Sequence, residues 1–440
     1  MTTTSEPPVT TAAPARPLEG IPSDPSVRTR FIPKERYLSQ EFHDQEAKHL
    51  WRRVWQVACR EQDVLNQGDF VEYKILDQSV LVVRQEDGAV KAFYNACAHR
   101  GRPLGSGSGQ KSQFRCPYHA WTFNLDGTIK SIPSPEEFAC GAKFDIDQVL
   151  VDTWGGFVFI NFDRNAPPLL DYLGPVAETL APYRFEKMIS TKRITNWFPS
   201  NWKTAIDPFI EAYHTVGSHP QLLMSLDDVN SKYELLGIHS RMLNPLFTAS
   251  PRAGEVDQQD VWDDFLEEIR GIGMDIGDSM GELPPNTTAQ DQVVKVFGEM
   301  AQAQGLDLSR MTDEHMRNVN CVSIFPNMCL QTMATEMFLW RARPLGGPGE
   351  CELDMWVLHP VPEGYDVPPS PELQYHKDFR EYDPGLTLFQ DFSNVWATHE
   401  GMKQDGFKGT LCASYQESRI VHMHDVIDMY LEGKPFEEMP

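Results

Sequence analysis

Two short clusters of cysteine and histidine near residue 100 constrain this chain more than any other feature. The first reads Cys97-x-His99 and the second reads Cys116-x-x-His119, with 16 residues between them. Thiolates and imidazoles are strong metal ligands, so four of them at this spacing predict a metal site. A structural zinc is the most frequent occupant of a Cys₂His₂ set, but zinc fingers usually begin with two cysteines close together. Here each cluster supplies one thiolate and one imidazole.

The same four ligands suit a Rieske [2Fe–2S] cluster, in which two cysteines hold one iron and two histidines hold the other. The segments "CAHRG" and "CPYHAWTF" resemble the Rieske signature. The resemblance implies that Cys97 and Cys116 hold the inner iron and that His99 and His119 hold the outer iron. We therefore expect a [2Fe–2S] cluster, with zinc as the alternative.

Two positions in these loops indicate which class of Rieske protein the chain resembles. The Rieske proteins of respiratory chains resemble this pattern but carry a further cysteine in each loop, and these two cysteines form a disulfide. The corresponding residues here are Arg102 and Tyr118. The chain thus resembles the Rieske domains of soluble oxygenases, in which the cluster stores an electron and a second site performs the chemistry.

Hydrophobic periodicity divides the chain into an all-β part and a mixed part. A length of 440 residues favours two domains, because it exceeds what one core usually supports. Residues 65–163 show the period of two of short antiparallel strands and are expected to form the Rieske domain. Residues 39–64 are expected to form an N-terminal helix of the catalytic domain, which otherwise covers residues 164–440. The Thr-, Pro- and Ala-rich residues 1–38 are expected to be a disordered tail.

A second group of candidate ligands lies within "NWKTAIDPFIEAYHTVGSHPQ", residues 201–221. We expect a helix from about Trp202, on which Glu211 and His214 share one face. His219 follows His214 by five residues, which on a straight helix would turn the two imidazoles about 140° apart. The glycine, serine and proline around His219 allow the helix to end there, so both imidazoles can face one ion. The alternative is an amphipathic helix with solvated acids and two incidental histidines.

Two histidines and one carboxylate form the ligand set of many non-heme Fe(II) oxygenases, which leave positions open for O₂. We expect the carboxylate from Asp391 in "LFQDFSNVW", on a helix with apolar neighbours. An acid on such a buried face is costly unless it is paired or bound to a metal. Asp383 and Glu400 are nearby alternatives.

The motifs "NWK…E-x-Y-H-x₄-H" and "QD…N-x-W" together resemble the catalytic domain of Rieske non-heme iron oxygenases. These are the terminal (α) components of aromatic-ring-hydroxylating dioxygenase systems. The resemblance implies an α+β fold, with an all-β Rieske domain followed by a helix-grip domain, an antiparallel sheet around a long helix. It assigns His214, His219 and Asp391 to a mononuclear Fe(II), with O₂ as co-substrate. It assigns Glu211 the role of a bridge for electron transfer. Asp207 is a candidate for a residue that lies behind the metal ligands without binding the metal itself.

Glu211 departs from the pattern of many ring-hydroxylating dioxygenases, which carry aspartate three residues before the first histidine ligand. Some family members that oxidise alkylammonium compounds such as betaines also carry glutamate there. The longer side chain can still accept a hydrogen bond from an imidazole, so the bridging role is retained. Glutamate at this position leaves both substrate classes open, the aromatic compounds and the alkylammonium compounds.

The resemblance also implies partner proteins. The chain has no flavin signature and no dinucleotide-binding motif, so a separate NAD(P)H-dependent reductase is expected, with or without a ferredoxin. Electron transfer between subunits in this family implies a homotrimer, with or without a small β subunit. A formal net charge of −24 argues against nucleic acid or an anionic membrane as a partner. The absence of a long apolar segment and of a secretory signal, with eight cysteines, favours the cytoplasm.

These observations predict a terminal oxygenase that hydroxylates or cis-dihydroxylates an aromatic or apolar small molecule. Apolar side chains on the expected catalytic strands favour such a pocket, although they are more often core residues: Met328, Met333, Met337, Phe338 and Trp340. The alternative is a monooxygenase or N-demethylase of a quaternary ammonium compound, whose cation aromatic rings can hold. More distant alternatives are an electron carrier and a zinc-stabilised binding protein.

Overall fold

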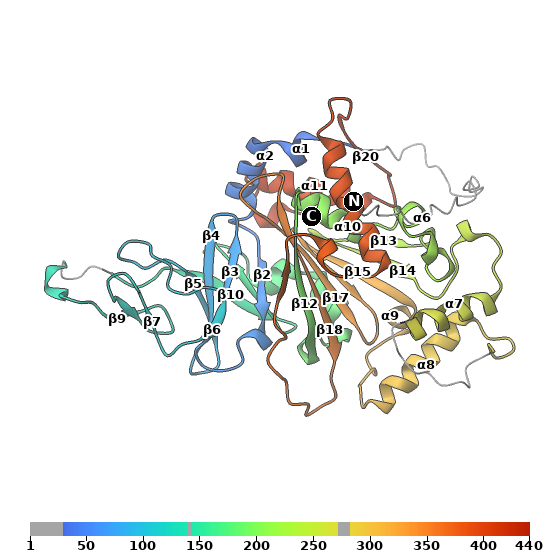
Figure 1. The fold of residues 1–440 in the computed structure, drawn as a ribbon, viewed down its shortest axis with the longest axis horizontal. Coiled ribbons are helices and arrows are strands. Elements are labelled where there is room, and N and C mark those ends of the chain that lie inside the picture. The colour runs from blue at the N-terminus through green and yellow to red at the C-terminus, as the bar shows by residue number, and fades with distance from the viewer. Residues whose placement is uncertain (1–29, 139–142, 272–281) are drawn as a thin grey trace, which may run out of the picture.

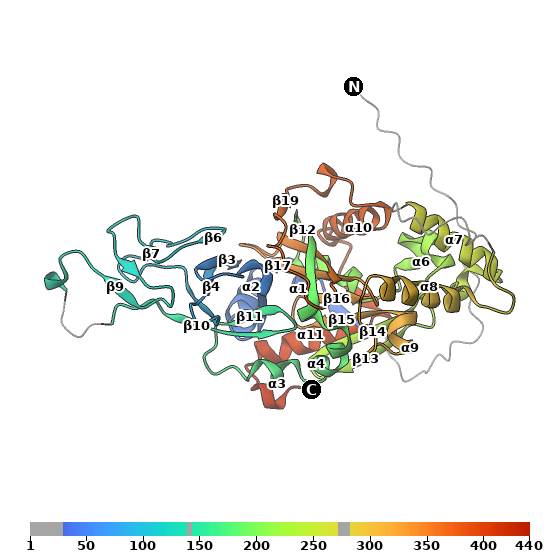
Figure 2. The ribbon, with the colours of Figure 1, turned by 90° about the horizontal axis from the view of Figure 1, so that it is seen from below.

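The eight-stranded sheet of the C-terminal part and the seven-stranded sheet of the N-terminal part stand side by side in the computed structural model (Figure 1). The structure describes residues 30–138, 143–271 and 282–440. A view from below shows the N-terminal sheet projecting away from the helix-covered C-terminal part (Figure 2). The predicted α+β fold class, a β domain followed by an antiparallel sheet with helices, is confirmed.

The seven-stranded sheet is antiparallel throughout and has the order β2-β11-β10-β5-β4-β3-β6. A small sheet, β7-β8-β9, continues it at the end farthest from the C-terminal part (Figure 1). A separate apolar core fills this end, and Cys97 and Cys116 belong to it. The strands are β2 (Gln56–Arg60), β3 (Asp69–Ile75), β4 (Gln78–Arg84), β5 (Val90–Tyr94), β6 (Ser108–Gln110), β7 (Phe114–Arg115), β8 (Thr122–Phe123), β9 (Ile129–Ser131), β10 (Gln148–Trp154) and β11 (Phe157–Asn161).

The eight-stranded sheet has the order β13-β14-β15-β16-β17-β18-β12-β19 and is antiparallel except for the pair β12 and β19. Its strands are β12 (Met188–Phe198), β13 (Lys232–Leu236), β14 (His239–Pro245), β15 (Asn318–Ile324), β16 (Met328–Thr332), β17 (Met337–Pro344), β18 (Cys351–Pro360) and β19 (Gln374–His376). The helices around it include α3 (Leu169–Leu173), α4 (Pro175–Leu180), α5 (Trp202–Ile206), α6 (Thr215–Ser218), α7 (Gln258–Gly271), α8 (Ala289–Ala303), α9 (Asp313–Arg317), α10 (Leu386–Met402) and α11 (Ser418–Leu431).

The two parts share buried structure at their junction. The largest apolar cluster runs from the C-terminal sheet into β2 and β11 of the N-terminal sheet. Arg341 on β17 donates to the Val57 carbonyl of β2 and pairs with Asp354 at 2.7 Å. The carboxyl pKa of Asp354 stays below its usual range, because the neighbouring arginines outweigh the effect of burial. The junction therefore fixes the N-terminal sheet against the C-terminal one.

The structure differs from two expectations near the N-terminus. The helix expected over residues 39–64 covers only α2 (Gln40–Gln45) and the π-helical turn η1 (Glu46–Leu50), and residues 56–60 form β2. All five residues of β2 are buried, and a short, fully buried run does not show whether it is strand or helix by its periodicity.

The expected tail, residues 1–38, is also partly ordered. β1 (Arg30–Pro33) pairs with β20 (Gly409–Cys412), and α1 (Glu35–Leu38) buries Tyr37 completely. Residues 1–29 and 139–142 lie outside the described residues. Along the described parts of the chain, no helix combines the length and apolarity needed to cross a membrane.

Candidate active site

The two cysteine–histidine loops have the same backbone hydrogen-bond pattern. Cys97 N–H donates to the carbonyl of Arg102, and Cys116 N–H donates to the carbonyl of Trp121, five residues ahead in each case. Each cysteine carbonyl accepts from the N–H four residues ahead, on Gly101 and Ala120. Two loops of one shape present one thiol and one imidazole each to a common space. The sequence pattern predicts this pairing of ligands, and the structure brings the two loops together.

The surroundings of these side chains fit a [2Fe–2S] cluster. Both cysteines are buried, and the rings of His99 and His119 lie 4.5 Å apart. His99 stacks on Trp121 at 4.9 Å, and its Nδ1 is buried with no hydrogen-bond partner among the described residues. Such an atom is costly unless a ligand satisfies it, and an iron would do so.

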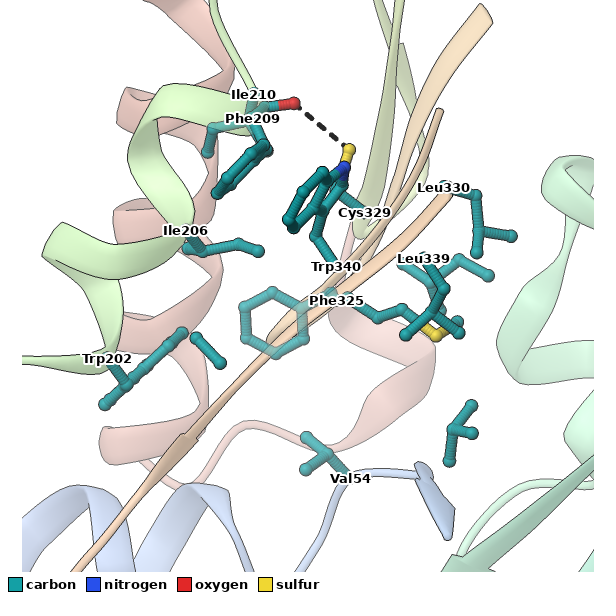
Figure 3. Packing of buried hydrophobic residues seen from close by; sticks show 14 of the residues in the cluster. Val54, Trp202, Ile206, Phe209, Ile210, Phe325, Cys329, Leu330, Leu339 and Trp340 are labelled. Atoms are coloured by element: carbon teal, nitrogen blue, oxygen red, sulfur yellow. Dashed lines mark hydrogen bonds between the residues drawn. The ribbon is translucent and has the colours of Figure 1, made fainter. Parts of the chain in front are cut away.

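The segment before the candidate ligands of the second site, α5 and the turn after it, is anchored by buried contacts to the rest of the protein. Asn201 caps α5, and Lys203 forms a fully buried ion pair with Glu46 at 2.8 Å. Figure 3 shows the next turn lying against β16 and β17, with the Phe209 ring stacked on Trp340 at 4.1 Å. The segment that precedes the candidate ligands is thus held on both sides.

The long helix expected from Trp202 does not form. α5 ends at Ile206, a short 3₁₀ turn, η6 (Asp207–Phe209), follows, and Glu211 lies in irregular backbone. Pro208 explains the break, because proline lacks an N–H and its ring clashes with the preceding helical turn. The expected continuous helix face shared by Glu211 and His214 is therefore wrong, although the two side chains still meet.

His214 and His219 lie at the two ends of α6, a single helical turn, and their rings are 5.1 Å apart. Asp391, on α10, lies between them. Its Oδ1 is 2.7 Å from His219 Nε2 and 3.5 Å from His214 Nε2. Three ligands bound at about 2.1 Å and at right angles would be roughly 3 Å apart, so this arrangement fits one metal ion.

The other acids that the sequence offered do not join this group. Asp383 accepts from the N–H of Gly385 before α10, and Glu400 pairs with Lys403 at the exposed end of that helix. Among the described residues, His214, His219 and Asp391 form the one group whose ligand atoms lie close enough to hold a single metal ion. Hydrogen bonds from the two histidines lower the pKa of Asp391, although its burial acts in the opposite direction.

Hydrogen bonds fix the orientation of both imidazoles. The Glu211 carboxylate accepts from His214 Nδ1 at 2.6 Å and from the His214 backbone N–H at 3.0 Å. His219 Nδ1 donates to the Gln390 side-chain carbonyl at 2.8 Å. Both Nε2 atoms are thereby left to face Asp391 and to bind a metal. Sequence reasoning missed Gln390, although it directly precedes the predicted carboxylate ligand.

The charge around His214 is strongly negative. Burial alone would lower the pKa of His214, but Glu211 and Asp391 raise it to about 10.

Asp207 lies at the start of η6, four residues before Glu211. Burial and the charge of Glu211 raise its pKa well above the usual range, and its Oδ1 has no hydrogen-bond partner among the described residues. Its expected role behind the site stays a prediction.

A cavity of about 280 Å³ opens beside the two histidines and Asp391. The register of the sheet explains which side chains reach it: Met242, Gln331 and Phe338 lie in one row across β14, β16 and β17. Of the five apolar residues expected on these strands, Met333 and Phe338 line the cavity, whereas Met328 and Met337 belong to the core. Trp340 is also buried in the core, beneath Phe209.

Comparison with known proteins gives two family matches. A model described as "Rieske [2Fe-2S] domain" matches residues 54–149, and one described as "Ring hydroxylating alpha subunit (catalytic domain)" matches residues 185–433. The carnitine monooxygenase oxygenase subunit of Acinetobacter pittii (strain PHEA-2) is 33% identical over 212 residues, which cover 46% of this chain and 57% of that protein. The corresponding subunit of Escherichia coli (strain K12) is 36% identical over 197 residues, or 43% and 52% of the two chains.

The match thus spans only about half the length of these two curated relatives. The biphenyl dioxygenase subunit alpha of Paraburkholderia xenovorans (strain LB400) is 26% identical over 376 residues, which cover 82% of this chain and 77% of that protein.

Solved structures share the fold. A quaternary ammonium Rieske monooxygenase in complex with L-carnitine superposes with a TM-score of 0.66 at 19% identity, covering 94% of this chain and 100% of the other. Naphthalene 1,2-dioxygenase with bound indole gives a TM-score of 0.63 at 19% identity, covering 91% and 92%. The chain therefore belongs to the ring-hydroxylating oxygenase α-subunit family, and it carries a Rieske [2Fe–2S] domain ahead of the catalytic domain.

Proposed function

We propose that this protein is the terminal oxygenase of a multicomponent system and inserts one atom of O₂ into a small quaternary ammonium compound. The observation that carries the proposal is the cavity beside the two histidines and Asp391. Three phenylalanine rings and two carboxylates line it, and no lysine or arginine does so among the described residues. Aromatic rings and negative charge attract an organic cation.

The relatives support this substrate class over the aromatic or apolar one that the sequence alone favoured. The curated relatives at 33–36% identity are named carnitine or glycine betaine monooxygenase oxygenase subunits. Glutamate at position 211 agrees with the alkylammonium-oxidising branch that the sequence resembles.

Three side chains are proposed to hold the mononuclear iron: His214, His219 and Asp391. Iron bound to two histidines and a carboxylate keeps positions open for O₂ and supplies the oxidising chemistry, with electrons stored by a Rieske cluster. Glu211 and Gln390 keep both Nε2 atoms directed at the metal position. The residues that line the cavity are proposed to orient the substrate.

Glu211 is further proposed to connect the two kinds of site between subunits. Cys97 and Cys116 share an apolar core with Phe114 of β7, and Ile129 of β9 packs against it. β7 and β9 lie at one end of the molecule, whereas α6 and α10 lie in the other part (Figures 1 and 2). A second copy of the chain is therefore the proposed source of electrons, with Glu211 accepting a hydrogen bond from an imidazole of that copy. A homotrimer, a separate reductase and a cytoplasmic location belong to the same proposal.

A second candidate, dihydroxylation of an aromatic ring, has support from the match to biphenyl dioxygenase, which covers more of the chain. The cavity, with Phe209, Phe247 and Phe338, would also accept an aromatic ring.

One experiment separates the two candidates. Iron-loaded protein with a chemically reduced cluster is given ¹⁸O₂ and either a panel of trimethylammonium compounds or biphenyl. Monooxygenation consumes two electrons and two protons, and it places one oxygen atom in the product and the other in water. We expect an ammonium-derived product with a single ¹⁸O atom. A diol of biphenyl with two ¹⁸O atoms, and no ammonium-derived product, would contradict the proposal.

A further inference from the structure

We propose that Gln331 is a specificity-determining residue: its side-chain NH₂ group is a fixed hydrogen-bond donor in the cavity wall and holds an oxygen atom of the substrate on the sheet side of the cavity. This inference rests on the proposed function and deepens it. It comes from a side-chain carbonyl that the protein already holds, because that contact determines the direction of the nitrogen beside it.

The Gln331 amide can face the cavity in only one way. Its carbonyl oxygen accepts from the Trp340 indole N–H at 2.7 Å. An indole nitrogen donates and does not accept, so the amide cannot exchange its oxygen and its NH₂ group by a half turn without losing this hydrogen bond. The NH₂ group is therefore the end that remains for other partners.

Packing fixes the indole that holds the amide. Trp340 is buried, and its ring stacks on Phe209 at 4.1 Å with the two planes 13° apart (Figure 3). Gln331 of β16 pairs with Phe338 of β17, two residues before Trp340. Because alternate residues of a strand share a face, these side chains stand on the same face of the sheet. The direction of the amide thus depends on strand register and on a rigid ring.

The NH₂ group of Gln331 reaches the cavity. Gln331 lines the cavity and is half-buried, and its nitrogen is not one of the sealed, unpaired polar atoms of the described residues. Its neighbour across the strands, Cys321, offers only a sulfur, which is a weak acceptor. An NH₂ group has two hydrogens, so at least one is available to a ligand that carries an oxygen acceptor.

The position of this donor gives the substrate a second point of attachment. Gln331 belongs to the sheet, whereas the proposed iron ligands lie at the two ends of α6 and on α10. A substrate that is held by an oxygen at the sheet and that reaches the iron with its other end keeps one orientation. Such positioning accelerates a reaction without any change in its chemistry.

Calorimetric binding to the intact, iron-loaded protein tests this inference with two ligands of the same charge and shape. They are (2-oxopropyl)trimethylammonium and (2-methylallyl)trimethylammonium, which differ only in a carbonyl oxygen in place of a methylene group. We expect the carbonyl compound to bind about 3- to 10-fold more tightly, as one hydrogen bond allows. Gln331→Leu, which removes the donor, should abolish this preference. Met242→Leu, in the same row of the cavity wall, should preserve it.

A further variant tests the role of the indole. Trp340→Phe keeps a ring against Phe209 but removes the N–H. The amide is then free to turn its oxygen towards the cavity, so the preference for the carbonyl compound should shrink.

The variants separate the amide from the iron as the source of a preference. Coordination of the carbonyl to the iron would also favour that compound, but such a preference would persist in Gln331→Leu. Persistence there, or equal binding of the two ligands by the wild type, would overturn the inference and leave the proposed function standing. Binding of biphenyl with no binding of either ammonium compound would overturn both. If Gln331→Leu does not fold, as judged by circular dichroism, Gln331→Met, which keeps the length of the side chain, takes its place.

Discussion

The Glu211 carboxylate holds His214 at two points, the imidazole Nδ1 at 2.6 Å and the backbone N–H at 3.0 Å. It therefore fixes both the ring and the start of the one-turn helix α6. The same carboxylate is proposed to face an imidazole of a neighbouring subunit.

Replacing Glu211 should separate iron binding from catalysis. We expect Glu211→Ala to keep its iron when Fe(II) is saturating, because all three ligands remain, but to lose at least about 100-fold in turnover, because the connection between subunits is broken. Iron analysis combined with steady-state assays measures both. Glu211→Asp, which keeps a carboxylate, should recover part of the activity. Normal turnover by the alanine variant would refute the bridging role.

His239 should make the stability of the fold depend on pH. Its Nδ1 accepts from the Phe325 N–H and its Nε2 donates to the Tyr172 carbonyl, and burial lowers its pKa to about 4. The unfolded chain binds this proton from about pH 6.5 downward, so the stabilisation is complete above pH 6.5 and is lost as the pH falls towards 4. The loss amounts to about 3 kcal/mol.

Urea denaturation between pH 4 and 7 measures this dependence. His239→Gln should flatten the curve in that window, whereas His359→Gln, at a side chain that is 43% exposed, should leave it unchanged. Parallel curves for the wild type and His239→Gln would show that another group is responsible.

The buried pair of Lys203 and Glu46 should matter for the stability of the fold. Glu46→Ala leaves the fully buried ammonium without a counter-charge, which should cost about 3–5 kcal/mol in the free energy of unfolding. The double variant Glu46→Ala/Lys203→Met should recover part of the loss. An exposed pair gives the control: Glu432→Ala, which frees Lys434, should cost less than about 1 kcal/mol. Equal effects of the two alanine variants would contradict this account.

Phe247 combines a strained backbone with a place in the cavity wall. Its φ is +54°, in the left-handed region, and its ring lies 5.2 Å from Phe265 of α7 and 6.1 Å from Phe297 of α8. Removing the ring should let the protein bind benzyltrimethylammonium, which is bulkier. Phe247→Gly should be more stable than Phe247→Ala by about 1 kcal/mol, because glycine adopts this φ without strain. An alanine variant as stable as the glycine variant would show that the backbone carries no strain here.

Much of the site could be predicted from residue spacing, because metal ligands must converge whatever the backbone does between them. Cys97, His99, Cys116 and His119 sit on loops whose shape follows from local hydrogen bonds. The position of Asp391 was predictable because a lone acid on an apolar helix face needs a partner.

The remaining features depend on tertiary structure. Pro208 ended the expected helix early, yet the Glu211–His214 contact survived, since it needs only neighbouring backbone and no continuous helix. Residues 56–60 were misassigned because β2 is buried on both faces. The place of Phe247 in the cavity wall depends on the packing of α7 and α8, which no local pattern encodes.

Iron content with and without Asp391 tests the central claim most directly. The intact protein should hold about three irons per chain, two in the cluster and one at His214, His219 and Asp391. Asp391→Ala should hold about two, with the Rieske-type absorption spectrum unchanged, and Asp383→Ala should still hold about three. Full iron content in Asp391→Ala, or a loss of the third iron in Asp383→Ala alone, would contradict the assignment of this site.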